Sequence, residues 1–163
     1  ITCQYALFFF PNAQKALKNI KKNLKKSGKI GITVHGAAEK VPFFNSIFDA
    51  VTEFIPDYSP PGSPDLDRFG TKSSLTDEVK KAGFSKITVK NFVFRFNPGT
   101  FEDYWRSYLR YVAKPLKEKL DALGRSKRNE LKNAVRENVK PYTLKNKTIE
   151  FPWEVLILTA QNN

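Results

Sequence analysis

Hydrophobic and polar positions change period several times along the chain, and each period predicts an element. Residues 1–10 are almost all apolar after Gln4, which is typical of a buried strand that runs into a loop at about Tyr5–Phe10. Apolar residues recur at helical spacing over 13–24, with lysines on the other face of the helix. The segment 29–34 is typical of a second strand. Strand, helix and strand in this order predict a parallel βαβ unit with a right-handed crossover.

The middle of the chain alternates helix, loop and strand. Residues 41–55 place apolar, mostly aromatic side chains along one helical face. The four prolines of 56–65 disfavour a helix or a central strand, so this stretch is expected to be an exposed loop. A short helix is expected over 74–82. The segment 84–96 alternates as a long strand, with one phase slip near Asn91 that a bulge would explain.

Helices predominate before the last strand. Three helical segments follow the Pro98-Gly99 turn, and the apolar run 148–160 predicts the final strand. Capping preferences predict the helix boundaries: Asn12, Ser74, Thr100 and Ser126 as N-caps, and Gly28, Gly83 and Gly124 as closing glycines. The pattern predicts one α/β unit with a helical insertion between its last two strands.

Composition narrows the class of protein. The 163 residues suit one domain, and an apolar content of 40% is enough for a core. Cys3 is the only cysteine, which excludes an internal disulfide and a cysteine-based zinc site. Together with the lack of a signal peptide in this sequence, it favours the cytoplasm. No apolar run approaches the roughly 20 residues that a membrane span needs, so we expect no membrane insertion.

The net charge of +12 makes nucleic acid a possible partner. Lysine outnumbers arginine 21 to 7, however, and base-edge readout favours arginine. A solvated lysine surface is the more common explanation of such a balance.

Few residues are candidates for catalysis. His35 is the only histidine, and it follows the second strand at the place where open α/β sheets bind ligands. A polar residue that merely ends the strand is the alternative. Cys3 has no basic neighbour in the sequence, which favours a core cysteine over a nucleophile.

Two aromatic groups admit two interpretations each. Phe43, Phe44 and Phe48 either line an apolar pocket or pack in the core, as helical stripes usually do. The stretch 104–111 mixes aromatic residues with arginines, as some nucleic-acid surfaces do. Tyr104 and Tyr108 share one helical face with Trp105, which favours packing.

Three strings resemble the carboxyl-terminal half of class I S-adenosylmethionine-dependent methyltransferases. They are YALFFFPNAQKALKNIKKNLKKSGKIGITVHG (5–36), LTDEVKKAGFSKITV (75–89) and FPWEVLILTAQ (151–161). The resemblance implies a partial Rossmann-like α/β sheet, with strands equivalent to the fourth to seventh of the family and the last one antiparallel. It also implies a helical insertion at about 98–145 and a single domain part over 1–163.

The resemblance implies a site as well. In the family, the loop after the fourth strand lies against the methionine and sulfonium end of the cofactor, and here it holds Gln4, Tyr5, Ala6 and Leu7. His35 would be a substrate-side polar group or base. An apolar small-molecule acceptor would contact Phe43, Phe44, Phe48, Tyr104 and Tyr108. No metal is implied.

The family's glycine-rich cofactor loop has no counterpart in this sequence, which begins at Ile1 and contains no methionine. We therefore expect the chain alone to be inactive and to bind S-adenosylmethionine weakly or not at all. An open apolar strand at residues 1–7 would favour a homodimer. Two alternatives remain: a nucleic-acid-binding or nucleic-acid-methylating protein, and a dimerising module without enzymatic activity.

Overall fold

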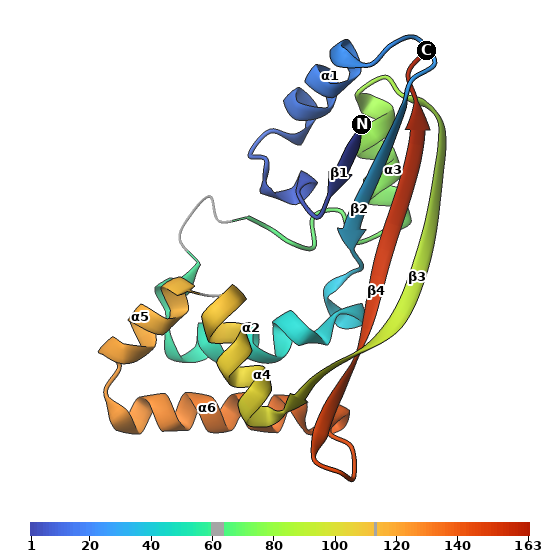
Figure 1. Cartoon of the computed structure of the whole chain (residues 1–163). Helices are drawn as coiled ribbons and strands as arrows, with labels where there is room; N and C mark the ends of the chain where they lie inside the picture. The colour runs from blue at the N-terminus through green and yellow to red at the C-terminus, as the bar shows by residue number, and fades with distance from the viewer. Residues whose placement is uncertain (60–63, 113) are drawn as a thin grey trace. The chain divides into compact units, whose positions relative to one another are not determined.

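A computed structural model describes residues 1–59, 64–112 and 114–163 and shows an α/β chain (Figure 1). It divides into two compact units. The first contains 1–41, the described part of 62–94, and 153–163; the second contains the described part of 42–61, and 95–152. Within the described residues, no helix combines the length and the apolar character needed to cross a bilayer.

One four-stranded sheet organises the first unit. Its strands are β1 (Thr2–Gln4), β2 (Lys29–His35), β3 (Ser85–Thr100) and β4 (Thr148–Gln161), in the spatial order β1-β2-β4-β3. β1 is parallel to β2, whereas β4 is antiparallel to β2, as the arrows in Figure 1 show. The predicted partial Rossmann-like sheet, with its last strand antiparallel, is confirmed. β3 and β4 both continue into the second unit.

Alternation along β2 explains the core of the first unit. Ile30, Ile32 and Val34 are buried, whereas Gly31 and Thr33 between them are half-buried. They pack with Leu17 of α1 (Ala13–Asn23) and Leu75 of α3 (Lys72–Lys81) in one apolar cluster. A 3-10 turn, Leu7–Phe9, connects β1 to α1 and contributes Leu7 and Phe8 to the same cluster.

The end of α1 differs from the prediction. Asn12 is the expected N-cap, with its side chain accepting a hydrogen bond from the Lys15 amide at 2.8 Å. The helix ends at Asn23, however, and Gly28 is not its closing residue. A Cβ at Gly28 would lie 2.8 Å from the Lys25 carbonyl oxygen, so glycine is required there by close approach of the backbone.

Two N-caps lie elsewhere than predicted. Thr71 caps α3, and Ser74 is the N3 residue of its capping box rather than the cap. Gly124 precedes α6, so Ser126 lies inside that helix. Thr100 caps α4 as expected. Gly83, at φ +89°, follows α3 as predicted.

The phase slip predicted near Asn91 does not interrupt β3, which is continuous from Ser85 to Thr100. Among the described non-glycine residues of β3, Lys86 alone has a positive φ, at +48°. The expected loop 56–65 is described only in part. It begins with a 3-10 turn at Pro56–Tyr58, and 60–63 lie outside the described residues.

Helices make up most of the second unit. α2 (Pro42–Phe54) packs against α6 (Arg125–Val139), where the Asn138 side chain donates to the Ser46 carbonyl at 3.1 Å. The remaining helical segments of this unit are α4 (Phe101–Ser107), a π-helical segment (Tyr108–Val112), α5 (Lys114–Ala122) and a 3-10 turn (Lys140–Tyr142). The helical insertion predicted between the last two strands is therefore present.

Candidate functional site

The carboxyl ends of β1 and β2 meet because the two strands are parallel. The backbone amide of Tyr5, just after β1, donates to the carbonyl of Thr33 in β2 at 2.9 Å. The Tyr5 ring lies beside the His35 ring, with centroids 4.6 Å apart and planes tilted by 33°. Tyr5, which the family resemblance assigned to the cofactor, and His35, which was assigned to the substrate, are therefore neighbours in the structure. This edge is the place where open α/β sheets bind ligands.

Tyr5 also has an uncommon backbone conformation, with φ at +47°. Bulky side chains disfavour this left-handed region, and such residues concentrate at binding and catalytic sites. The positive φ turns the chain sharply after Gln4, and it is compatible with a site in which the loop backbone approaches a ligand.

Aromatic rings enclose His35. Its ring centroid lies 5.6 Å from that of Phe8 and 5.5 Å from that of Trp153, in addition to its contact with Tyr5. The side chain is 9% exposed. Burial lowers the pKa of His35 from 6.5 to about 4, so the imidazole is neutral at neutral pH.

The four residues predicted to contact a cofactor differ in exposure. Gln4 is exposed, and Tyr5 and Ala6 are half-buried. Leu7 is fully buried in the apolar core and anchors the loop there. Gln4 and Tyr5 are thus the two that offer polar or aromatic groups to a ligand at this edge.

The five residues predicted to contact an acceptor all lie in the second unit. Phe43, Tyr104 and Tyr108 are buried, and the Phe43 ring lies 5.2 Å from that of Tyr104 and 5.8 Å from that of Tyr108. The Tyr104 hydroxyl donates to the Phe43 carbonyl, and burial raises the pKa of both tyrosines. Phe44 is half-buried, and Phe48, 39% exposed, contacts Tyr58. The structure therefore gathers three of the five in one core.

A buried carboxylate near His35 was not predicted from the sequence. Glu154 in β4 is 4% exposed, and it accepts hydrogen bonds from Lys40 Nζ at 3.4 Å and Asn91 Nδ2 at 3.1 Å. Its backbone carbonyl accepts from the Gly36 amide at 2.9 Å. The carboxylate thus ties the segment after β2 to β3 and β4, and it neutralises the charge of Lys40 next to the site.

Trp153, the residue before Glu154, was also missed as a site residue. It contacts His35, and its ring stacks on Phe94 at 6.0 Å. Both residues lie in an apolar run that predicts only a strand, so nothing in the sequence distinguished them. Their partners lie more than 50 positions away in the chain and come together only through strand pairing.

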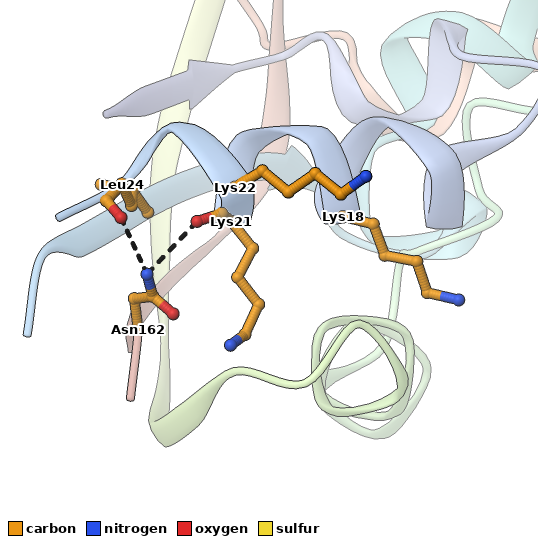
Figure 2. Close-up of a pocket in the computed structure, with 5 residues that line it drawn as sticks. All are labelled: Lys18, Lys21, Lys22, Leu24 and Asn162. Carbon is orange, nitrogen blue, oxygen red and sulfur yellow. Dashed lines mark hydrogen bonds between the residues drawn. The ribbon is translucent and has the colours of Figure 1, made fainter. Parts of the chain in front are cut away.

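Other candidates lie apart from this edge. Cys3 is buried and burial raises the pKa of its thiol, which matches a core cysteine. Among the described residues, no three histidine, cysteine, aspartate or glutamate side chains gather as a metal site. A pocket of about 400 Å³ lies instead over α1, lined by Lys18, Lys21, Lys22, Leu24 and Asn162 (Figure 2).

No family model matches the sequence, and no curated protein matches it. Two proteins are among the solved structures that resemble this chain. One is a Bacillus halodurans protein provisionally assigned as a methyltransferase, with a TM-score of 0.52 and 19% identity, over 99% of this chain and 68% of that one. The other is YcgJ from Bacillus subtilis, with a TM-score of 0.52 and 15% identity, over 100% of this chain and 63% of that one.

The chain thus spans about two thirds of the length of each of these two proteins. At these identities the likeness concerns the fold. Together with the strand order and the antiparallel last strand, it shows that this chain has a Rossmann-like α/β fold that resembles the fold of the provisionally assigned methyltransferase.

Proposed function

We propose that this chain forms the carboxyl-terminal half of a methyltransferase that moves a methyl group from S-adenosylmethionine to a small, apolar molecule. The observation that carries the proposal is the meeting of Tyr5 and His35, 4.6 Å apart, at the carboxyl ends of two parallel strands. The methyltransferase-like fold supports it.

The residues present fit one end of the cofactor. S-adenosylmethionine supplies an electrophilic methyl group on a positively charged sulfur. Tyr5 is half-buried and offers a ring face, which attracts cations, and Gln4 offers an exposed amide. Ala6 and Leu7 complete the loop. Nothing in this sequence resembles the glycine-rich loop that would hold the rest of the cofactor, so we propose that the chain alone binds it weakly and does not turn over.

We propose that His35 positions the acceptor. Because its pKa is about 4, the imidazole is neutral at physiological pH and can accept a hydrogen bond from an N–H or O–H group of the acceptor. Such a low pKa makes it a weak general base. In-line methyl transfer depends mainly on alignment of donor and acceptor, so a positioning role is sufficient.

An apolar acceptor is supported by the aromatic character of α2 and α4. Phe44 and Phe48 retain exposed surface and can contact a ligand, while Phe43, Tyr104 and Tyr108 are buried and pack against one another. Pockets for small molecules are mostly apolar with a few polar groups, as this composition would provide. We further propose that the chain acts in the cytoplasm and that it associates as a homodimer through the open edge of β1.

Titration of this chain with S-adenosylmethionine, followed by NMR, tests the proposed site. At millimolar ligand we expect the signals of Gln4, Tyr5 and His35 to shift, and we expect adenosine, which lacks the sulfonium end, to shift them much less. Unchanged signals at these residues, or equal shifts with adenosine, would refute the site. Binding of S-adenosylmethionine with a micromolar dissociation constant in calorimetry would refute the proposal that this chain lacks the glycine-rich part of the cofactor site.

A further inference from the structure

All charged side chains in the first 38 residues of the chain are positive. Residues 1–38 contain seven lysines, all between positions 15 and 29, and no aspartate or glutamate. α1 buries Ala13 and Leu17 in the core and directs Lys15, Lys18 and Lys22 to solvent. The positive charges therefore gather on the outer face of one helix and on the turn that follows it.

These lysines are not neutralised within the described part of the chain. None of the seven forms an ion pair there, although ion pairs occur elsewhere on the surface, for example between Lys132 and Glu102 at 2.6 Å. Glu78 of α3, whose backbone carbonyl accepts a hydrogen bond from the Gln14 side chain of α1, is half-buried, and its carboxylate pairs with Arg68 at 3.7 Å instead of with a lysine. The surface over α1 thus keeps its full charge for an external partner.

The lysines surround a concave surface. Lys18, Lys21 and Lys22 line the pocket of about 400 Å³ together with Leu24 and Asn162, and Figure 2 shows their side chains extending from one side of α1. Asn162 fixes the end of the helix, because its side-chain amide donates to the carbonyls of Lys21 at 3.2 Å and Leu24 at 2.9 Å. The pocket is therefore built on a well-anchored helix end.

The end of α3 lies close to Lys21, one of the residues that line the pocket. The Lys21 side chain reaches over the end of α3, where its Cε would lie 3.3 Å from a Cβ at Gly83. The last turn of α3 carries the exposed residues Lys80 and Lys81. Exposed lysines of two helices thus lie near one another on the surface, an arrangement that attracts an extended polyanion.

The surroundings favour a nucleic-acid backbone over a lipid bilayer. A helix that inserts into a membrane surface needs an exposed apolar face, and the apolar face of α1 is in the core. None of the large exposed apolar side chains falls within 13–29 or 72–83, both fully described. Lysines act as point charges for phosphates, without the planar geometry that arginine uses to read bases.

We propose that this basic groove, the pocket over α1 lined by Lys18, Lys21 and Lys22, binds the phosphate backbone of a nucleic acid without sequence preference, with Lys80 and Lys81 at the neighbouring end of α3 adding to its positive charge. The site is separate from the Tyr5–His35 edge. It would retain the protein on a polyanion whichever molecule is methylated, so the proposal does not depend on the proposed function.

Fluorescence anisotropy with a labelled single-stranded oligonucleotide of about 20 nucleotides tests this proposal. Contacts from three to five lysines predict a slope of roughly −2 to −3.5 in a plot of log affinity against log salt, since each contact with a single strand contributes about −0.7. The triple variant Lys18→Gln, Lys21→Gln, Lys22→Gln should bind at least tenfold more weakly, with a slope less negative by about 2.

A matched control separates the effect of the groove on binding from the effect of the net charge. Replacing the exposed Lys117, Lys127 and Lys145 by glutamine also lowers the charge from +12 to +9 (12 minus 3), but far from α1 along the chain. The proposal requires this variant to bind almost as the parent chain does, with both variants showing the parent's circular dichroism spectrum. Equal losses in the two variants, or tighter binding to phosphatidylserine vesicles than to the oligonucleotide, would overturn it.

Discussion

His35 is the only histidine of the chain, and its burial couples folding to pH. Its pKa is lowered from 6.5 to about 4 in the folded chain because burial penalises the charged form. The unfolded chain therefore binds a proton below pH 6.5, whereas the folded chain binds one only near pH 4. The stability contributed by the neutral imidazole is complete above pH 6.5 and is lost as the pH falls toward 4.

We expect the free energy of unfolding to fall by about 1.5 kcal/mol between pH 6.5 and pH 5, where most carboxylates stay ionised. Urea unfolding at several pH values measures this change, and His35→Gln should remove most of it. A direct NMR titration of the single histidine gives an independent check. A midpoint near 6.5 in the folded chain would contradict the enclosure of His35 by Tyr5, Phe8 and Trp153.

Gly36, next to His35, lies so close to Glu154 that there is no space for a larger side chain at position 36. A Cβ at Gly36 would lie 2.5 Å from Glu154 Oε2 and 2.7 Å from Glu154 Cβ. We expect Gly36→Ala to destabilise the chain by about 2 to 3 kcal/mol, because the buried carboxylate would have to leave Lys40 and Asn91. Chemical denaturation measures the loss.

Gly31→Ala is the control within the same chain segment. A Cβ at Gly31, in β2, would meet only the Thr2 Cγ2 at 3.9 Å, an ordinary contact. This variant should keep the parent's stability within about 0.5 kcal/mol, since an added methyl group suits an extended backbone. Similar losses at both glycines would show that the Glu154 contact does not explain the effect.

The residues of the candidate site divide into those that the sequence can indicate and those that it cannot. His35 is indicated by its position at the carboxyl end of a predicted strand, and Tyr5 by the resemblance of its loop to that of a known family. Trp153 and Glu154 are in the middle of an apolar run. Their contacts with His35, Lys40 and Asn91 depend on the register of β4 against β2, in which His35 pairs with Val155. A single sequence contains no indication of that register.

At the level of elements, helix caps give a direct comparison between sequence and structure. Thr100 caps α4: its hydroxyl accepts from the Asp103 amide at 3.3 Å and donates to the Asp103 carboxylate at 2.6 Å. Ser126, expected as a cap, lies within α6 and donates to Glu130 at 2.9 Å. We expect Thr100→Ala to cost about 1 kcal/mol and Ser126→Ala much less.

Both substitutions are in the second unit, so the difference between their unfolding midpoints in urea isolates the effect of the cap. A loss at Ser126 as large as that at Thr100 would indicate that α6 begins at Ser126 in solution.

The elements themselves were largely predictable, whereas their ends were not. Apolar periodicity located β2, α2 and β4 to within a residue or two, since each buries a continuous face. The ends of α1, α3 and α6 depend on groups far away in the sequence, or on which of several neighbouring residues acts as the cap. Asn162, from the other end of the chain, satisfies the last carbonyls of α1 that Gly28 was expected to serve. Local sequence preferences cannot include such a partner.

On the scale of the whole molecule, the sheet has two open edges of different character. β1 has three residues and is the outer strand on one side, and β3, with sixteen residues, is the outer strand on the other. Phe92, Val93 and Phe94 of β3 are each more than 45% exposed. Open strands with apolar side chains favour pairing with another chain. We therefore expect two copies of the chain to associate, and an experiment must determine whether they pair through β1 or through β3.

We expect light scattering to show a homodimer whose population rises with concentration, and we expect Thr2→Pro to abolish it. In β1 the Ile1 carbonyl and the Tyr5 amide bond to β2, so by alternation the Thr2 amide points to the open side. A proline at position 2 removes this outward donor without removing a hydrogen bond to β2. The control Thr2→Val keeps the donor and should keep the dimer. A monomer at all concentrations would refute the association, and a dimer that survives Thr2→Pro but dissociates in Phe92→Lys would place it at β3 instead.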